Sequence, residues 1–333
     1  MAQPKVSVIV PIYGVEQYIE RCARSLFEQT LDDIEYIFVD DCTKDNSVSV
    51  LGKVIEKYPS RKNKIRIIRH DINKGLPQAR KTGIEAACGK YVAHCDSDDF
   101  VEKDMYEQLY QKAEELNADI VFCDLYYDGR YKNIFKAFPS DKTDKAYMNY
   151  HCCSYTGTVT MVQYFCKRSM YTENNIQYPK AMIMEDQVVT SQLRYFAKKF
   201  GYVQKPLYHY IINNNSMTNF KSLDDTLNKI WQIKENTDII IDFFRVHNIG
   251  DNYITTLKTR SVVDLLTSIK DRAVIKTTRA SFYPEINNKI IFNKEIPMVI
   301  RTRYFLLSHR LYRIDHAIRH NATLVKIILF FIH

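Results

Sequence analysis

Two kinds of apolar pattern alternate along the first 125 residues. Continuous apolar runs fit strands that are buried on both faces, whereas apolar residues three or four positions apart fit amphipathic helices. The runs that predict strands are Val6–Val10, Ile34–Val39, Ile65–Arg69, Tyr91–Cys95 and Ile120–Cys123. The stretches that predict helices are 19–27, 50–58, 76–87 and 102–116. Strands and helices that alternate every ~25–30 residues predict a parallel sheet with helices on both faces.

This alternation ends after Asp124. Residues 126–160 are rich in Tyr, Lys and Asp and predict loops with short strands. A helix is expected at Glu185–Lys198 and a strand at Gly201–Tyr210, and nearly everything from Leu223 onward has helical spacing. We therefore expect an α/β part followed by a helical C-terminal region, with soft boundaries near residues 125 and 220.

The composition is that of a globular protein with more than one domain. The 333 residues are 46% hydrophobic and 26% charged, which excludes collagen-like and disordered chains. Eight cysteines include no C-x-x-C pair, so we expect reduced thiols in a cytoplasmic protein rather than a zinc site or a disulfide framework. We expect no signal peptide, and the longest apolar run, Leu324–Ile332, is about half the ~20 residues of a membrane-spanning helix.

The segment 297–333 is basic. It carries six Lys or Arg residues against the single acid Asp315, and therefore more than half of the formal net charge of +8. One hypothesis is a basic amphipathic helix pair that lies on the inner face of the cell membrane, near a lipid-linked acceptor. The alternative is a helical lid that packs on the main body or on a second copy of the chain, as in a homodimer. We expect no nucleic-acid partner, because the basic residues are not clustered with stacking aromatic residues.

Acidic residues follow two of the predicted strands. Asp40 and Asp41 come after the second strand, and Asp96, Asp98 and Asp99 come after the fourth. Ligands of open parallel sheets bind at such carboxyl ends, and a divalent cation shared with phosphates would compensate three neighbouring acids. The alternative is that these acids cap the helices that follow them. The D-x-D pattern alone leaves both interpretations open.

Other nucleotide-binding motifs are absent from the sequence. None of the nine glycines forms a G-x-G, which excludes the dinucleotide-binding fingerprint, and no G-K-[ST] is present for a P-loop. A bound nucleotide would therefore depend on a metal ion and on carboxylates.

Four motifs occur in order along the first 125 residues, namely VSVIVPIY, VDDCTKDNS, NKGLPQARKTG and GKYVAHCDSDD. Their order and spacing resemble those of family 2 glycosyltransferases of the GT-A fold. MED at 184–186 resembles the family's ED motif, and YHY at 208–210 with NSMT at 215–218 resembles its Y-x-Y…NS-x-T segment. The resemblance implies an α/β fold with a mostly parallel sheet flanked by helices. It assigns 1–125 to nucleotide-sugar binding, 126–220 to the acceptor and the catalytic base, and 221–333 to a helical C-terminal region.

The first three motifs imply roles in donor binding. By the resemblance, Pro11 and Tyr13 line the site of the base and ribose. Asp41 is similar to the family's acid that accepts a hydrogen bond from a base N–H, with Asp40 beside it. Arg80 is expected to face the diphosphate. Alone, an arginine of this kind is more often a solvated charge.

The later motifs imply the metal site and the chemistry. By the resemblance, Asp96 holds the ribose or the donor sugar, and Asp98 ligates Mn²⁺ or Mg²⁺. Asp186 is similar to the family's catalytic base, with Glu185 supporting it or orienting the acceptor. His209 occupies a position where some relatives have a further metal ligand, although a packed histidine is the more frequent arrangement. Without the resemblance, Glu185 and Asp186 would be explained by a helix N-terminus that favours acids.

The resemblance implies an inverting transfer from a UDP- or GDP-linked sugar to a hydroxyl group of a glycan or lipid-linked acceptor, in polysaccharide or glycolipid assembly. The Q-x-x-R-W signature of processive synthases is absent, since Asn228 precedes Trp231 by three residues. Cys42 and Thr43 replace the family's usual Gly-Ser, so that turn must form without glycine, and Gly14 replaces a usual asparagine. A nucleotide-sugar nucleotidyltransferase and a catalytically silent binding module are the alternatives.

Overall fold

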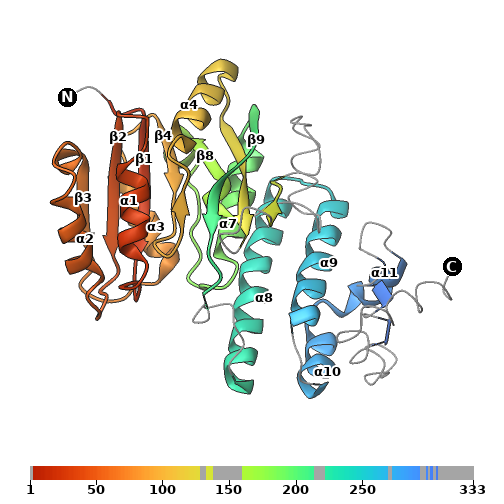
Figure 1. Ribbon diagram of the computed structural model, residues 1–333. Coiled ribbons are helices and arrows are strands. Elements are labelled where there is room, and N and C mark those ends of the chain that lie inside the picture. Colours follow the sequence, from red (N-terminus) through yellow and green to blue (C-terminus); the bar gives the residue numbers. More distant parts are fainter. Residues whose placement is uncertain are drawn as a thin grey trace. The chain divides into compact units, whose positions relative to one another are not determined.

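The computed structural model describes residues 3–127, 133–137, 160–213, 222–268 and 272–292, with isolated positions at 298, 301–302 and 305–306. The chain divides into two compact units. The first comprises Met1–Cys152 with Thr156–Asn219, and the second comprises Cys153–Tyr155 with Phe220–His333. The first unit is α/β and the second is helical (Figure 1).

Nine strands of the described residues form one sheet in the order β3-β2-β1-β4-β8-β6-β9-β5, with β7 paired to β6. The strands are β1 (Val6–Ile12), β2 (Ile34–Asp40), β3 (Ile65–Arg69), β4 (Tyr91–His94), β5 (Phe100–Val101), β6 (Ile120–Tyr127), β7 (Ile134–Phe135), β8 (Tyr164–Lys167) and β9 (Phe200–Tyr210). The first four strands are parallel neighbours, as are β6 and β9, whereas β8 runs antiparallel between β4 and β6. The predicted mostly parallel sheet is confirmed.

Helices cover both faces of this sheet. One core contains α1 (Ile19–Phe27), α2 (Ser47–Ile55) and α4 (Met105–Leu116), and the other contains α3 (Leu76–Ala86), α6 (Ser169–Thr172) and α7 (Glu185–Phe196). The continuous apolar run of β1 explains this arrangement, because alternate side chains of a strand point to opposite faces. Val8 and Val10 belong to the first core, and Ile9 between them belongs to the second.

The second unit consists of helices, as the spacing from Leu223 onward predicts. They are α8 (Leu223–Val246), α9 (Asp251–Ser268), α10 (Arg272–Ser281) and α11 (Asn287–Phe292). The Ser222 hydroxyl accepts a hydrogen bond from Asp225 N at 3.1 Å and so caps α8. None of the helices in the described part of the chain is long and apolar enough to cross a membrane. The basic segment 297–333 lies almost entirely outside the described residues.

Candidate active site

The carboxyl ends of β1, β2 and β4 meet at one edge of the sheet. Ile12 at the end of β1 is in register with Asp40 of β2, and Ile9 is in register with His94 of β4. Asp41 N donates a hydrogen bond to Ile12 O at 3.0 Å, and Cys95 N donates to Ile9 O at 3.0 Å. The acidic segments that follow β2 and β4 therefore flank the same strand.

Residues at the end of β1 and β2 form a turn around Asp40. Pro11 pairs with Val39 inside the sheet, and Tyr13, just beyond the strand, is 52% exposed. Asp40 is buried, accepts a hydrogen bond from Thr43 N at 2.8 Å and lies 3.3 Å from Arg69 Nε. These contacts make Asp40 a residue that shapes the turn.

Helix capping does not account for the acids after β2. The next helix, α2, has Asn46 at its N-cap without a side-chain hydrogen bond. Asp45 accepts the hydrogen bond of Ser47 N at 3.1 Å instead. Asp41 points to the segment after β3, where His70 Nδ1 lies 2.7 Å from its Oδ1. The capping alternative for Asp40 and Asp41 is therefore wrong.

The Asp96–Asp99 turn is fastened to β9. Tyr208 donates its hydroxyl hydrogen to Asp99 Oδ2 at 2.6 Å and accepts from Asp96 N at 3.1 Å, and Ile211 N donates to Asp99 Oδ1 at 2.7 Å. The short strand β5 follows directly, so α4 begins at Met105 and not near residue 102. Capping of α4 by Asp98 or Asp99 is therefore also wrong, and the buried Asp99 supports the turn.

The negative charge of Asp98 is unfavourable in this turn. Burial, with the neighbouring charge of Asp96, raises the pKa of Asp98 to about 6. Arg21 of α1 donates to the backbone carbonyl of Asp98 at 3.0 Å and covers the Phe100 ring, 4.7 Å from its centroid. A cation beside Asp98 would offset the unfavourable charge.

Arg80 joins three of the predicted site residues. It is 2% exposed, and its Nη2 donates to Asp96 Oδ1 at 2.8 Å while its Nη1 donates to Glu185 Oε1 at 2.5 Å. The same Nη1 forms an ion pair with Asp186, whose other oxygen accepts from Met161 N at 2.9 Å. The third, fourth and ED motifs therefore meet at one guanidinium.

The charges around Arg80 do not balance. Burial opposes the charge of Arg80, but the carboxylates of Asp186, Asp96 and Glu185 outweigh it and raise the pKa of Arg80 well above its usual range. Burial, together with the nearby Asp186, raises the pKa of Glu185 well above its usual value. Three carboxyl groups around one cation thus favour the protonated form of Glu185 more than water does.

His209 lies apart from this ionic cluster. Its ring stacks between Phe100, at a centroid distance of 4.1 Å, and Tyr126, at 4.6 Å. Its Nε2 lies 2.8 Å from Glu102 Oε1. Among the described residues, no group of three or more His, Cys, Asp or Glu side chains is arranged to hold a metal ion. The NSMT segment at 215–218 lies outside the described residues.

The chemistry of these donors nevertheless fits Mn²⁺ or Mg²⁺. Such hard cations are commonly held by one or two carboxylates and by the phosphates of the substrate, not by a full protein cage. Asp98 offers carboxylate oxygens and a raised pKa, while Asp96 Oδ1 is already engaged by Arg80. Asp98 is therefore the residue best suited to a shared cation.

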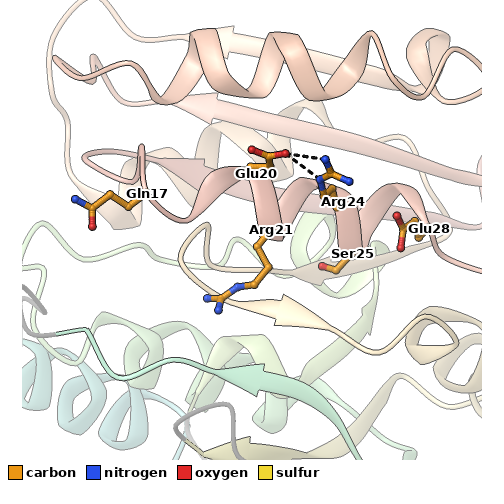
Figure 2. Close-up of a pocket in the computed structure, with 6 residues that line it drawn as sticks. All are labelled: Gln17, Glu20, Arg21, Arg24, Ser25 and Glu28. Atoms are coloured by element: carbon orange, nitrogen blue, oxygen red, sulfur yellow. Dashed lines mark hydrogen bonds and ion pairs between the residues drawn. The ribbon is translucent and has the colours of Figure 1, made fainter.

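A hollow of about 510 Å³ lies along helix α1 (Figure 2). It is lined by Gln17, Glu20, Arg21, Arg24, Ser25 and Glu28. Figure 2 shows Glu20 and Arg24 paired with each other and Arg21 pointing away from them. None of the candidate acids lines this hollow, so we do not assign the chemistry to it.

A family model decides the identity of the chain. The model described as glycosyl transferase family 2 matches residues 7–227, which include all of the motifs described above apart from Val6, the first residue of the first motif. The chain belongs to the family 2 glycosyltransferases. Among the relatives of this chain, EpsH of Bacillus subtilis (strain 168), named as a glycosyltransferase, is 34% identical over 226 residues, or 65% of this chain and 63% of EpsH. The match therefore spans less than two thirds of EpsH's own length.

A second relative of this chain is TarP of Staphylococcus aureus (strain N315), a poly(ribitol-phosphate) beta-N-acetylglucosaminyltransferase. It is 25% identical over 265 residues, which are 76% of this chain and 79% of TarP. Relatives of the chain thus include an enzyme that modifies a polymer.

Solved glycosyltransferase structures share the GT-A fold of this chain. S. aureus TarS 1–349 has a TM-score of 0.62 at 18% sequence identity, and the aligned part covers 95% of this chain and 91% of the TarS chain. TarS 1–349 has also been solved in complex with UDP-GlcNAc. The mannosyltransferase PcManGT from Pyrobaculum calidifontis, in complex with GDP-Man and Mn²⁺, has a TM-score of 0.53 at 13% sequence identity. The aligned part covers 96% of this chain and 87% of the PcManGT chain. At these identities the likeness establishes the fold alone.

Three residues of this chain, Asp99, Tyr208 and His70, make contacts in the candidate site that could not be predicted from the sequence. Asp99 and Tyr208 pair although 109 positions separate them, and only the Y-x-Y segment pointed to Tyr208. His70 contacts Asp41 and had no motif of its own. Each is known only from the arrangement of the strands.

Proposed function

We propose that the chain is an inverting glycosyltransferase that moves a sugar from a nucleoside diphosphate to a hydroxyl group of a glycan or lipid-linked acceptor. The observation that carries this proposal is the ionic cluster around Arg80. It brings together Asp96, Glu185 and Asp186, which come from separate parts of the chain, beside the turn that contains Asp98.

Asp186 has the role of general base in this proposal. Its two oxygens are held by Arg80 and by Met161 N, so the carboxylate has a fixed orientation. It takes the proton of the acceptor hydroxyl while that oxygen attacks the anomeric carbon and the nucleoside diphosphate leaves from the opposite face. A positioned base of this kind contributes ~10²–10⁴-fold to the rate.

The donor side of the proposal involves the strand edge described above. Pro11 and Tyr13 line the base and ribose, Asp41 accepts a base N–H, and Asp96 holds the ribose or sugar. Asp98 would hold Mn²⁺ or Mg²⁺, which would neutralise charge on the departing diphosphate. The Nε of Arg80 is buried and has no hydrogen-bond partner in the described part of the chain, so it is available to the diphosphate. The nucleotide sugars bound to TarS and PcManGT support this donor class.

The acceptor side is proposed at the ends of β6 and β9. Tyr127 is 47% exposed and its ring lies parallel to that of Tyr210, at 5.6 Å and 4°. Ile134 and Phe135 of β7 are exposed beside this pair in the sheet. Such an aromatic surface suits the apolar face of a sugar ring. Together with the polymer named for TarP, it supports a role in surface polysaccharide or glycolipid assembly.

The proposed place of action is the cytoplasm and the inner face of the cell membrane. The six cysteines in the described part of the chain are free thiols, in keeping with a reducing compartment. Docking would be provided by the basic segment 297–333, and liposome flotation with and without that segment tests it. Equal flotation of both proteins would favour the lid or the homodimer.

One experiment separates the proposed function from its two alternatives. The protein is titrated with nucleoside diphosphates. It is also incubated, with Mn²⁺ or with chelator, either with nucleotide sugars or with nucleoside triphosphates and sugar 1-phosphates, while nucleotide release and pyrophosphate formation are recorded. A glycosyltransferase binds a nucleoside diphosphate in the presence of Mn²⁺ and releases it from the sugar, and Asp98→Ala abolishes the metal-dependent binding. Pyrophosphate formation would identify a nucleotidyltransferase, which would need a glycine-rich basic loop after β1. A silent module would tolerate loss of Asp98 or Asp186.

A further inference from the structure

The carboxylate of Asp41 already accepts three hydrogen bonds. Its Oδ1 accepts from Lys74 N at 2.8 Å and lies 2.7 Å from His70 Nδ1, and its Oδ2 accepts from Gly75 N at 2.8 Å. A carboxylate oxygen only accepts, so His70 Nδ1 carries a hydrogen in this pair. Asp41 is therefore clamped by the segment that follows β3.

Counting lone pairs shows what the clamped carboxylate can still do. Each carboxylate oxygen has two acceptor sites. Both sites of Oδ1 are taken by His70 and Lys74, whereas Oδ2 has one site left. Asp41 is 3% exposed, which matches one remaining contact and not an open face of two oxygens.

We propose that His70 and the backbone of Lys74 and Gly75 restrict Asp41 to one further acceptor site, and so select a nucleoside diphosphate whose base has a single imide N–H. Uracil and thymine have this edge. The inference rests on the proposed function, because it places a donor base at Asp41, and it names the substrate class that the sequence left open between UDP- and GDP-linked sugars.

The edges of the other bases do not match this single site. Guanine presents two adjacent donors, N1–H and an N2 amino hydrogen, which a carboxylate binds well only with both oxygens. Cytosine and adenine present an amino group beside a ring nitrogen acceptor, whose lone pair faces the carboxylate. A ligand binds a buried site much more weakly when one of its polar groups stays unpaired there, or when one of its acceptor atoms faces an acceptor of the protein. In uracil, two carbonyl oxygens flank the imide N–H, so a second free carboxylate oxygen would be unfavourable.

His70 is itself held in place. It is buried, and its Nε2 lies 2.9 Å from Thr82 Oγ1 on helix α3. The ring therefore connects α3 to Asp41 and keeps one acceptor site of Oδ1 occupied. His70 acts through Asp41, which makes it a positioning residue for base recognition.

The test is a panel of nucleoside diphosphates measured by calorimetry with Mn²⁺ present. For the full-length wild-type protein, UDP or dTDP binds at least about tenfold more tightly than GDP, CDP and ADP, because an unmatched buried polar group costs about that much affinity. The UDP and dTDP titrations distinguish the two imide bases. Tighter binding of GDP, or equal binding of UDP, GDP and CDP, would overturn the inference.

Two substitutions at His70 test its part in the selection. His70→Leu frees an acceptor site on Oδ1, so the ratio of GDP to UDP dissociation constants falls by about tenfold. His70→Asn is the matched control, because its amide nitrogen takes the place of Nδ1 and keeps the hydrogen bond, so the ratio stays near the wild-type value. A loss of stability alone weakens all nucleotides together and leaves the ratio unchanged. An unchanged ratio in a folded His70→Leu protein would contradict the role of His70.

The two levels of the proposal fail in different ways. If none of the diphosphates binds and no sugar is transferred, the proposed function is wrong. If sugar is transferred from a GDP-linked donor, the function stands and the selection by Asp41 and His70 is wrong.

Discussion

Glu185 Oε1 lies 2.5 Å from Arg80 Nη1, inside a cluster where one guanidinium meets three carboxyl groups. The cluster connects helix α3, the turn after β4 and the start of α7. A buried ionic group of this kind stabilises the fold only while all of its members are present. The same contacts that hold these segments together therefore orient the proposed base.

Removing the guanidinium tests that dependence. We expect Arg80→Met to lower the free energy of unfolding at neutral pH by about 3–5 kcal/mol, because the buried carboxylates lose the cation that pairs with them. Urea denaturation measures the change. Arg24→Met is the control, since Arg24 pairs with Glu20 on the surface, where solvent screening leaves such pairs with little effect on stability. Equal losses in the two variants would show that the cluster is not structural.

Asp186→Asn separates catalysis from donor binding. We expect turnover to fall by ~10²–10⁴-fold because the amide cannot take the acceptor proton, while nucleotide affinity with Mn²⁺ stays near normal. Steady-state release of the nucleoside diphosphate and calorimetry provide the two measurements. Asp242→Asn, on the surface of the helical unit, is the control that retains activity. Wild-type turnover in Asp186→Asn would remove this residue from the role of base.

The substitution Glu185→Gln tests whether the pKa of Glu185 is raised in the folded protein. The pKa of Glu185 in the folded protein is well above its usual value of 4.5, so its protonated form stabilises the fold fully below that pH. This stabilisation is lost as the pH rises toward the folded pKa. We expect the variant, which is always neutral, to lose less stability than the wild type between pH 5 and 8 in urea unfolding.

Two results would contradict that assignment. A wild type whose stability relative to Glu185→Gln rises from pH 5 to 8 would mean that Glu185 is ionised in the fold. A turnover loss as large as that of Asp186→Asn would mean that Glu185 takes part as an anion. We expect the smaller loss, because glutamine still accepts the hydrogen bond of Arg80.

The sheet and its helices were predictable because their patterns are local. The apolar run at Val6–Val10 and the helical spacing from Ile19 to Phe27 specify a strand and a helix without reference to the rest of the chain. Strand β8 was not predicted, since four residues between turns carry too little periodicity. Its antiparallel place between β4 and β6 is decided by tertiary pairing.

The candidate site was predictable as a set of residues but not as a set of contacts. The motifs indicated Arg80, Asp96 and Asp186, whereas their ion pairs depend on how segments 106 residues apart meet. The sequence suggested a diphosphate partner for Arg80, and the fold surrounds it with carboxylates. Capping of α4 remained an open alternative because β5 is too short to be recognised from the sequence.

Tyr208→Phe tests the support of the metal-binding turn. We expect a loss of about 1–3 kcal/mol in the free energy of unfolding, because the buried Asp99 loses a hydrogen bond, and weaker nucleotide binding with Mn²⁺. Tyr106→Phe is the control, since its buried hydroxyl has no hydrogen-bond partner in the described part of the chain. It should retain stability and binding. Wild-type stability in Tyr208→Phe would show that Asp99 does not need this contact.

Cys42→Gly tests the strain in the turn between Asp41 and Thr43. Cys42 has φ 59°, in the left-handed region, which costs a non-glycine residue ~1–2 kcal/mol. Glycine removes this strain, but its greater conformational freedom in the unfolded chain offsets part of the stability gained. We therefore expect the free energy of unfolding to rise by about 0.5–1 kcal/mol in urea denaturation.

Cys88→Gly is the matched control for that substitution. Cys88 is not among the residues with positive φ, so glycine there only adds freedom to the unfolded chain and should lower the stability by ~0.4–1 kcal/mol. Opposite signs at the two positions would show that backbone strain, and not the loss of a thiol, decides the effect. A loss of stability in both variants would mean that the Cys42 side chain contributes more than its strained backbone costs. Its 3.6 Å contact from Sγ to Asp71 O is too long and weak to predict that outcome.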